Sequence, residues 1–531
     1  IVFMFWTDRI ALRIEADLKE KIASGIPLII RDEKTASGRV HTGSMRGAAI
    51  HGVVSEVLSE RGIKNTFLWE MNDFDVMDGL PVYLDQEKFT PYRGQPLYTV
   101  PSPDGKAKNY AEYFAEEFAG VIEETGFRPS YYRASVLYLS GKMNGVIRTA
   151  LEHAEDIRRI YREVSGSTKE GAWLPLAVIC ESCGKVGTTK ATSFDGNLVS
   201  YECGNFVEWA KGCGHAGKIS PFDGRAKLPW KVEWAAKWKV VGVAIEGGGK
   251  DHSTKGGARD VANRISREVF GYEPPFDIPY EFFLVGGKKM SSSKGAGTSA
   301  RDIANLLPPH LFRLALLGKD PKQAFDFEPE GETIPVLFDI YDRLAERYFS
   351  GEKDDQARLF QLVHFPEERQ NLKEHFRVRF SQVVFLVQMP HLDIYAEVER
   401  LKGAPLTEED RADLDLRARY GRHWLSMYAP ETHRFELQKD AVPEGAHALS
   451  PDIKKIFAEL VRYIVQTKQL DGQELHSKLH ELRKESGVEA GPFFSALYQS
   501  FLGKDSGPKA GWFLSVLDRD FLLRRLKEVS V

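Results

Sequence analysis

The chain has 531 residues, of which 42% are hydrophobic and 28% charged, with a formal net charge of −4. This length and composition exclude a small or disordered chain and allow about three domains of ~150 residues each. The charge excludes a protein that is basic throughout but not one local patch for a polyanion. No apolar run approaches the ~20 residues of a membrane span, and the start lacks the basic flank of a signal peptide, so we expect a cytoplasmic protein with no membrane partner.

The first 150 residues alternate short apolar runs with amphipathic stretches. Residues 27–30 predict a buried strand, residues 42–61 a helix and residues 65–69 the next strand. Spacing of this kind implies parallel strands, so the sequence predicts an α/β sheet.

The rest of the chain departs from this α/β pattern in two places. Residues 171–225 hold many glycines and no helical period, which indicates a small inserted module. The α/β pattern returns with a strand expected at 240–245, a tight turn at 247–249 and a helix from Ser253 or Thr254 to about Val269. Beyond about residue 300 no convincing strand remains, and the C-terminal third predicts helices, with apolar residues at helical spacing at Ile453, Ile456, Phe457, Leu460 and Ile464.

All the cysteines of the chain lie in the inserted module, at Cys180, Cys183, Cys203 and Cys213. Clustered cysteines in a cytoplasmic chain favour a metal over disulfides, and thiolates at i and i+3 around a glycine turn can share one tetrahedral ion. We therefore predict a structural Zn²⁺ site, with His215 as the alternative to Cys213. Buried, unpaired cysteines are the other interpretation.

The segment from residue 35 to residue 44 reads Thr-Ala-Ser-Gly-Arg-Val-His-Thr-Gly-Ser and lies between the first predicted strand and its helix. Gly38 and Gly43 let the backbone approach a ligand closely, and the start of the helix offers free N–H groups to an anion. His41 can donate a hydrogen bond to a phosphate. The alternative is an ordinary capped helix with His41 satisfied locally.

A second cluster, Lys-Lys-Met-Ser-Ser-Ser-Lys-Gly at residues 288–295, suits a phosphate clamp. Its cations can stabilise negative charge that develops in a transition state. A solvated basic loop is the alternative interpretation.

Two more motifs suit a binding site. Residues 249–252, Gly-Lys-Asp-His, follow a predicted strand, and open α/β sheets bind ligands at the carboxyl ends of their strands. A helix cap by Asp251 is the alternative. In Trp-Lys-Val-Glu-Trp, residues 230–234, the aromatic rings can wall an aliphatic stem while Glu233 pairs with a cation. A core stripe is the alternative, which we favour for Trp238.

Together these motifs resemble the two signatures of class I aminoacyl-tRNA synthetases. The matches to the "HIGH" element are His41, Gly43 and Ser44, and those to "KMSKS" are Lys289, Ser291 and Ser293. Ser44 and Ser292 stand where the usual motifs have histidine and lysine. The order of the further blocks is similar to the class I lysyl-tRNA synthetases of archaea and some bacteria; these blocks are residues 69–75, 230–234, 249–252, 280–282 and 497–519.

The resemblance implies a Rossmann-type catalytic domain at 1–300 with a zinc-binding insertion at 171–225. A helical connecting domain at 301–390 and an all-helical anticodon-binding domain at 391–531 would follow. It also implies activation of L-lysine with ATP and Mg²⁺, and transfer of lysine to the 2′-OH of the terminal adenosine of tRNA(Lys).

The resemblance also suggests site residues. The catalytic set is His41, Ser44 and Lys289. The expected ATP-binding set is Gly38, His41, Gly43, Ser44, Gly249, Asp251, His252, Lys289, Met290, Ser291, Ser292 and Ser293. The expected lysine-binding set is Thr35, Asp73, Glu233, Trp234, Tyr280 and Glu281. Some relatives carry a second zinc site upstream, but residues 101–113 contain neither Cys nor His, so we expect it to be absent.

Three alternatives remain. A glutamyl or glutaminyl synthetase of class I would aim an arginine at a substrate carboxylate, and Arg31 and Arg39 are the residues to test. A nucleotidyltransferase without a tRNA role would not need the long helical C-terminus. A non-catalytic, zinc-bearing RNA-binding protein would not need His41 and Lys289.

Overall fold

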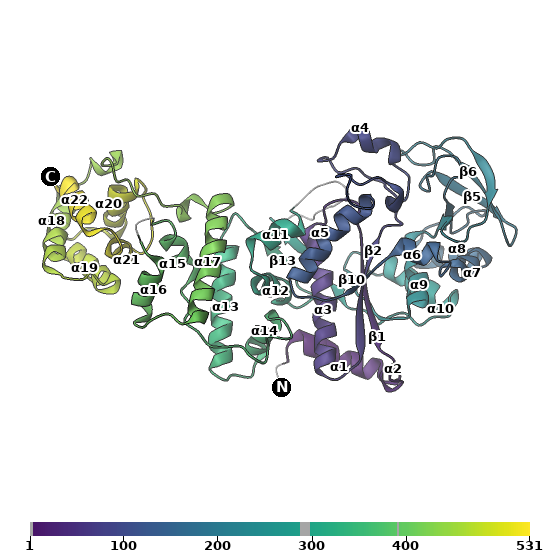
Figure 1. Cartoon of the computed structure of the whole chain (residues 1–531), viewed down its shortest axis with the longest axis horizontal. Helices are drawn as coiled ribbons and strands as arrows, with labels where there is room; N and C mark the ends of the chain where they lie inside the picture. The colour runs from purple at the N-terminus through teal and green to yellow at the C-terminus, as the bar shows by residue number, and fades with distance from the viewer. Residues whose placement is uncertain (1–3, 287–297, 390–391) are drawn as a thin grey trace. The chain divides into compact units, whose positions relative to one another are not determined.

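The computed structural model describes residues 4–286, 298–389 and 392–531 (Figure 1). The chain divides into two compact units. The first unit comprises Ile1–Glu328 with Arg343–Leu372, and the second comprises Pro329–Asp342 with Lys373–Val531. The predicted loop at 288–295 lies outside the described residues, including Lys289, Met290, Ser291, Ser292 and Ser293.

The first unit is built on a parallel sheet with the strand order β3-β2-β1-β9. These strands are β1 (Leu28–Thr35), β2 (Asn65–Asn72), β3 (Ser130–Arg133) and β9 (Val243–Ile245). Helix α3 (Met45–Glu60) connects β1 to β2 after a short 3-10 turn at Thr42–Ser44. The α/β prediction for residues 27–69 is confirmed.

Helix α3 lies close to the site end of β1 because it carries a glycine there. A Cβ on Gly47 would stand 2.3 Å from Oδ2 of Asp32 and 2.7 Å from the hydroxyl of Tyr280. Only a residue without a side chain lets the helix pass this close to both groups. Most of the helix is buried, including Ala48, Ala49 and Val53.

Two boundaries after the insertion differ from prediction. Residues 240–245 do not form one strand, because helix α9 (Trp230–Val241) runs on to Val241 and Gly242 ends it with a left-handed φ of 78°. Only Val243–Ile245 pair with β1. The helix expected from Ser253 or Thr254 begins later, since α10 (Ala258–Glu268) starts after Gly257. An apolar run is compatible with either element, and the glycine decides where the change falls.

The insertion forms two small antiparallel sheets. One pairs β4 (Ala177–Val178) with β8 (Ala226–Lys227), and the other has the order β5-β6-β7. The three strands of the latter are β5 (Thr189–Phe194), β6 (Val199–Cys203) and β7 (Ala216–Ile219).

Two short parallel pairs complete the strands of the first unit. They join β10 (Gly248–Gly249) to β11 (Pro279–Tyr280) and β12 (Phe283–Val285) to β13 (Phe325–Phe327). The expectation of no strand beyond residue 300 is therefore wrong at β13, a run too short to show alternation. The other helices are α1 (Trp6–Asp17), α2 (Lys19–Ala23), α4 (Gln86–Phe89), α5 (Tyr110–Glu124), α6 (Ala134–Leu139), α7 (Asn144–Glu152), α8 (Ala154–Ser165), α11 (Ala300–Leu306), α12 (Pro309–Leu317) and α14 (Asp355–Val363).

The described residues of the second unit form helices and loops only. Helix α13 (Thr333–Phe349) begins in this unit and ends in the first. The others are α15 (Phe380–Leu386), α16 (Ile394–Lys402), α17 (Glu408–Met427), α18 (Pro451–Gln466), α19 (Gly472–Glu485), α20 (Ala490–Leu502), α21 (Ala510–Ser515) and α22 (Arg519–Ser530). The apolar stripe from Ile453 to Ile464 is buried in its core, as predicted. Within the described ranges, no helix combines the length and apolarity needed to cross a membrane.

Candidate active site and metal centre

A cavity of about 360 Å³ opens at the carboxyl end of β1. This is where open α/β sheets bind ligands. Its lining comes from β1, β2, the turn before α3, the start of α9, the segment after β9, the strands β10, β11 and β12, and the residues that follow β10 and β11. The lining residues are Asp32, Glu33, Lys34, Thr35, His41, Gly43, Ser44, Trp69, Trp230, Trp234, Glu246, Gly247, Gly248, Gly249, Asp251, His252, Tyr280, Glu281, Phe282 and Phe283.

The structure brings most of the described predicted site residues to this cavity. Those that line it are Thr35, His41, Gly43, Ser44, Trp234, Gly249, Asp251, His252, Tyr280 and Glu281. Gly38, Asp73 and Glu233 do not line it. The carboxylate of Asp73 is buried and accepts hydrogen bonds from the backbone N and the hydroxyl of Ser135, at 2.7 and 2.5 Å. It therefore ties the end of β2 to α6.

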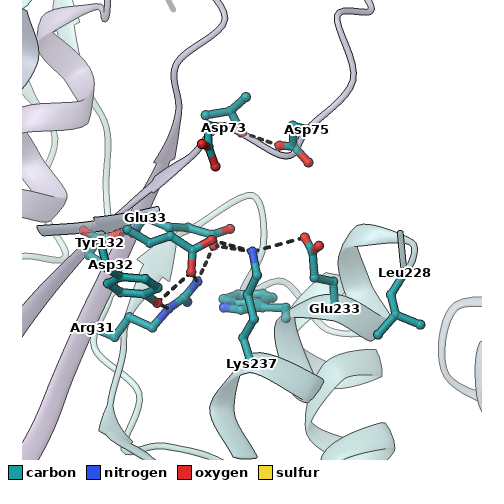
Figure 2. Close-up of polar contacts among 12 residues, drawn as sticks. Arg31, Asp32, Glu33, Asp73, Asp75, Tyr132, Leu228, Glu233 and Lys237 are labelled. Atoms are coloured by element: carbon teal, nitrogen blue, oxygen red, sulfur yellow. Dashed lines mark hydrogen bonds and ion pairs between the residues drawn. The ribbon is translucent and has the colours of Figure 1, made fainter. Parts of the chain in front are cut away.

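Beneath the cavity, buried charges form a network (Figure 2). Arg31 is fully buried, and its guanidinium contacts Glu246 at 2.6 Å, Glu70 at 2.8 Å and also Glu33. Lys237 is fully buried too. Its ammonium lies 2.5 Å from Glu70, 3.2 Å from Glu233 and 3.7 Å from Glu33. Every buried cation here therefore has more than one carboxylate partner.

The network continues to the carboxyl end of β1. The ammonium of Lys227 lies 2.7 Å from Glu233 and 2.9 Å from Asp75, and Asp75 accepts a hydrogen bond from the hydroxyl of Thr35. The whole network has three cations, Arg31, Lys227 and Lys237. It has five carboxylates, Glu33, Glu70, Asp75, Glu233 and Glu246. With every group ionised it carries a surplus of two negative charges.

Glu33 and Glu70 respond in opposite ways to this environment. Burial raises the pKa of Glu33 to about 7, although Arg31 and Lys237 oppose the shift. Burial also acts against ionisation of Glu70, but there Lys237 and Arg31 prevail and hold its pKa well below the ordinary value. The side chain of Glu33 remains 33% exposed, at the cavity wall. Glu33 therefore changes between its neutral and its ionised form near neutral pH.

Aromatic rings form another part of the wall. The rings of Trp230 and Trp234 stack with their centroids 6.0 Å apart, and the ring of His252 packs against both. The indole of Trp234 donates a hydrogen bond to Glu246 at 2.8 Å, which fixes its orientation. Trp238 is fully buried, as predicted.

Sequence reasoning missed several lining residues. They include Asp32, Glu33, Lys34, Trp69 and Glu246, whereas Trp230 lines the cavity as the motif at residues 230–234 suggested. A signal existed for the first of them: charged residues follow Ile30 without interruption to Lys34 in a strand whose start is buried. Charged side chains at the carboxyl end of a parallel strand indicate a binding site.

Neither Arg31 nor Arg39, the arginines that a glutamyl-type enzyme could have used to bind a substrate carboxylate, lines the cavity. The guanidinium of Arg31 already contacts three carboxylates, and its Nε donates a hydrogen bond to the hydroxyl of Tyr132 at 2.8 Å. The guanidinium of Arg39 contacts Glu117 at 3.2 Å and Asp302 at 3.3 Å, and Arg39 does not line the cavity. The observation that would have favoured a carboxylate substrate is therefore missing among the described residues.

The four cysteines of the insertion converge. Their sulfur atoms all lie within 4.8 Å of one another, with Sγ–Sγ distances of 3.7 Å for Cys180 to Cys213 and for Cys183 to Cys203. Four thiolates about 2.3 Å from a tetrahedral zinc ion would stand about 3.8 Å apart, so the set fits that ion. His215 is not in the group, and its ring packs on Tyr201 with a centroid distance of 5.9 Å.

Comparison with known families agrees with this architecture. A family model described as tRNA synthetases class I (K) matches residues 4–367, and one described as an anticodon binding domain matches residues 427–530. The parallel sheet with its helices and the helical C-terminal region are those of a class I aminoacyl-tRNA synthetase. Within that class, the chain belongs to the family tRNA synthetases class I (K).

Relatives resemble the chain over nearly its full length. A lysine–tRNA ligase of Methanosarcina barkeri (strain Fusaro) is 33% identical over 99% of this chain and 97% of its own. Those of Archaeoglobus fulgidus and Thermoplasma volcanium are 30% and 31% identical, covering 94% and 99% of this chain and 95% and 99% of theirs. A solved glutamate tRNA ligase from Elizabethkingia meningosepticum aligns with a TM-score of only 0.43 at 12% identity, covering 95% of this chain and 99% of that one.

Proposed function

We propose that the chain is a lysine–tRNA ligase, which activates L-lysine with ATP and then transfers the lysyl group to the 2′-OH of the terminal adenosine of tRNA(Lys). The observation that carries the choice of lysine is the surplus of carboxylates under the cavity. A cation moved out of water needs a carboxylate partner, and this network has two more carboxylates than cations, so Glu33 can accept a further cation although it already contacts Arg31.

In this proposal the side-chain ammonium of lysine lies against Glu33, and its aliphatic stem lies along Trp230 and Trp234. Tyr280, at the same cavity, presents its hydroxyl beside Asp32. An ammonium gains from a carboxylate and from aromatic faces together. We assign Thr35, whose hydroxyl donates a hydrogen bond to Asp75, to the α-amino end of the substrate.

The phosphates of ATP are assigned to the turn before α3, together with Gly249, Asp251 and His252, which line the same cavity. Gly43 leaves no room for a side chain there, because a Cβ would stand 2.9 Å from the ring of His41 and 3.2 Å from a backbone oxygen of Phe283. Ser44 and the start of the helix can offer hydrogen-bond donors to an anion. Lys289 and its serines would join them by family resemblance, and Mg²⁺ would accompany the nucleotide.

The chemistry then needs no protein nucleophile. The lysine carboxylate attacks the α-phosphorus, pyrophosphate leaves, and lysyl-adenylate forms. The terminal ribose hydroxyl of the tRNA next attacks the carbonyl carbon and AMP leaves. The protein contributes by positioning the reactants and by stabilising developing negative charge with His41 and Lys289. We assign residues 1–300 to this catalysis, 301–390 to a connecting domain and 391–531 to anticodon binding. The proposed location of the protein is the cytoplasm.

Zinc is the ion that we propose for the four cysteines, with a structural role, because four protein ligands leave no open position. We expect about one zinc per chain by metal analysis, and close to none after Cys183→Ser or Cys213→Ser. His215→Ala is the matched control and should keep its zinc, since the ring of His215 packs on Tyr201 instead. Loss of zinc in the His215 variant together with its retention in the Cys213 variant would contradict the ligand set.

The experiment for the function itself is ATP-dependent charging of tRNA(Lys) with labelled lysine. We expect labelled lysine to become acid-precipitable as lysyl-tRNA. Charging of the same RNA with glutamate, and not with lysine, would overturn the proposal.

A further inference from the structure

Among the described residues that line the cavity of the first unit, Lys34 is the only lysine or arginine. The acidic side chains of the same lining are Asp32, Glu33, Glu246, Asp251 and Glu281. Both reactants of the proposed activation bring anions to this wall, the amino acid through its α-carboxylate and ATP through its phosphates. Lys34 is therefore the described lining residue whose full positive charge can meet them.

The ammonium of Lys34 is not paired within the protein. No carboxylate lies within ion-pair distance of it in the described part of the chain, although its side chain is partly buried. Burial lowers the pKa of Lys34, and the charges of Asp32 and Glu33 oppose that shift. A partly buried cation without a carboxylate partner costs free energy, and an anionic ligand in the cavity would offset that cost.

Lys34 and Glu33 point to opposite sides of the sheet, because side chains alternate along a strand and β1 pairs with β2 in one register over its whole length. Glu33 lies on the side of α9, where it contacts Lys237 (Figure 2). Asp32 lies on the side of α3, with its Oδ2 3.1 Å from Nδ1 of His51. Lys34, two residues after Asp32, shares the side of α3 and of the turn to which the phosphates of ATP are assigned.

A buried donor on this side of the sheet also lacks a partner. Trp69 is the register partner of Asp32 and lines the cavity. Its indole nitrogen is buried and has no hydrogen-bond partner among the described residues. Buried donors in native proteins usually have a partner, so an acceptor from a ligand is expected on this side.

We propose that Lys34 is a catalytic residue of adenylate formation, whose ammonium donates hydrogen bonds to the nonbridging oxygens of the α-phosphate of ATP. This inference rests on the proposed function and adds to it a cation from β1 at the reacting phosphorus.

The place of Lys34 between Glu33 and Thr35 selects the α-phosphate. Those two residues are assigned to the two amino groups of the substrate lysine, so its carboxylate is expected beside this part of β1. One carboxylate oxygen forms a bond to the α-phosphorus while the bond from that phosphorus to the pyrophosphate oxygen breaks, and no proton is transferred. The ammonium of Lys34 stays charged and stabilises the negative charge on the oxygens of the transition state.

The first test is Lys34→Met, which keeps the length of the side chain and removes its charge. Release of labelled pyrophosphate in a single turnover, with saturating lysine and tRNA(Lys) present, should slow about 100- to 1,000-fold, as when one preorganised donor is removed from a transition state. The Kd for lysine, measured by calorimetry, should stay within about a factor of three, because the contact is made to ATP and not to lysine. Lys34→Arg keeps the charge and should release pyrophosphate faster than Lys34→Met.

The second test places sulfur at the α-phosphorus. The two diastereomers of the α-phosphorothioate of ATP each replace one nonbridging oxygen. The wild type should use at least one of them more slowly than ATP, and Lys34→Met should show a smaller difference for that diastereomer. The lost oxygen and the lost ammonium belong to one contact, so their effects do not add. A merely structural role of Lys34 would leave this difference unchanged.

Lys64→Met is the matched control. Lys64 is exposed and directly precedes β2, at the end of the sheet away from the cavity, so its loss should leave the rate and the sulfur effect unchanged. A wild-type rate in Lys34→Met, or an equal sulfur effect in Lys34→Met and the wild type, would overturn the proposal. Loss of lysine binding in both Lys34→Met and Lys34→Gln would assign Lys34 to the shape of the site and would overturn it too.

The wild-type chain tests the proposed function separately in the same assay. No pyrophosphate release with lysine, together with release with glutamate, would contradict the function itself. Normal release with lysine by the wild type and by Lys34→Met alike would contradict only the role of Lys34.

Discussion

Replacing Lys237 with methionine is expected to destabilise the first unit by about 3–5 kcal/mol, the cost of removing one partner from a buried ion pair. The methionine fills similar space, but it leaves Glu70 and Glu233 buried with less positive charge around them. The loss should be larger at pH 8 than at pH 5, because protonation relieves an unpaired buried carboxylate. Urea unfolding followed by circular dichroism measures both quantities.

Lys239→Met is the matched control on the same helix. Lys239 is exposed and donates one hydrogen bond to the backbone oxygen of Phe270 at 2.7 Å, so its loss should cost no more than about 1 kcal/mol. If the Lys237 variant were as stable as wild type at pH 8, the buried charges would not depend on one another as the structure indicates.

Glu33→Gln is expected to weaken lysine binding about 10- to 100-fold at pH 8, which corresponds to losing one charge-assisted hydrogen bond of about 1.5–3 kcal/mol. In the wild type, the affinity for lysine should rise as pH increases from 6 to 8. Glu33 has a pKa of about 7 and is mostly neutral below that pH and ionised above it. The lysine ammonium, with a pKa of about 10.4, stays charged throughout. Calorimetry at each pH measures the trend.

Two controls sharpen this result. Norleucine, which lacks the ammonium, should bind with little dependence on pH in this range. Glu281→Gln also alters a carboxylate that lines the cavity, but Glu281 is matched by Lys250 at 2.6 Å and lies outside the network that has more carboxylates than cations, so the effect should be smaller. Lysine affinity that is flat from pH 6 to pH 8 would remove Glu33 from the proposed ammonium contact.

Local sequence was sufficient for the parts of this protein that depend on neighbouring residues. The strand, turn and helix from residue 27 to residue 61 carry their own periodicity and glycines. The four cysteines are clustered in the sequence, so their meeting in space required no long-range information. The helical stripe from Ile453 to Ile464 repeats at the spacing of one helix face.

The charge network could not be predicted in the same way. Glu33 and Glu70 face one another because β1 and β2 pair in a particular parallel register, and Lys237 reaches both from a helix far along the chain. Pairing register and helix docking are long-range properties that no local pattern specifies. The motif at residues 230–234 illustrates the difference. Trp234 lines the cavity as predicted, whereas Glu233, one residue earlier on the helix, turns to Lys227 and Lys237.

The most direct test of the lysine assignment is ATP–pyrophosphate exchange with each of the twenty amino acids in turn, with tRNA(Lys) present in every reaction. Because the cavity has surplus carboxylates and no arginine among its described lining residues, we expect lysine to stimulate exchange far above the other nineteen. Stimulation by glutamate or glutamine, with none by lysine, would contradict the account.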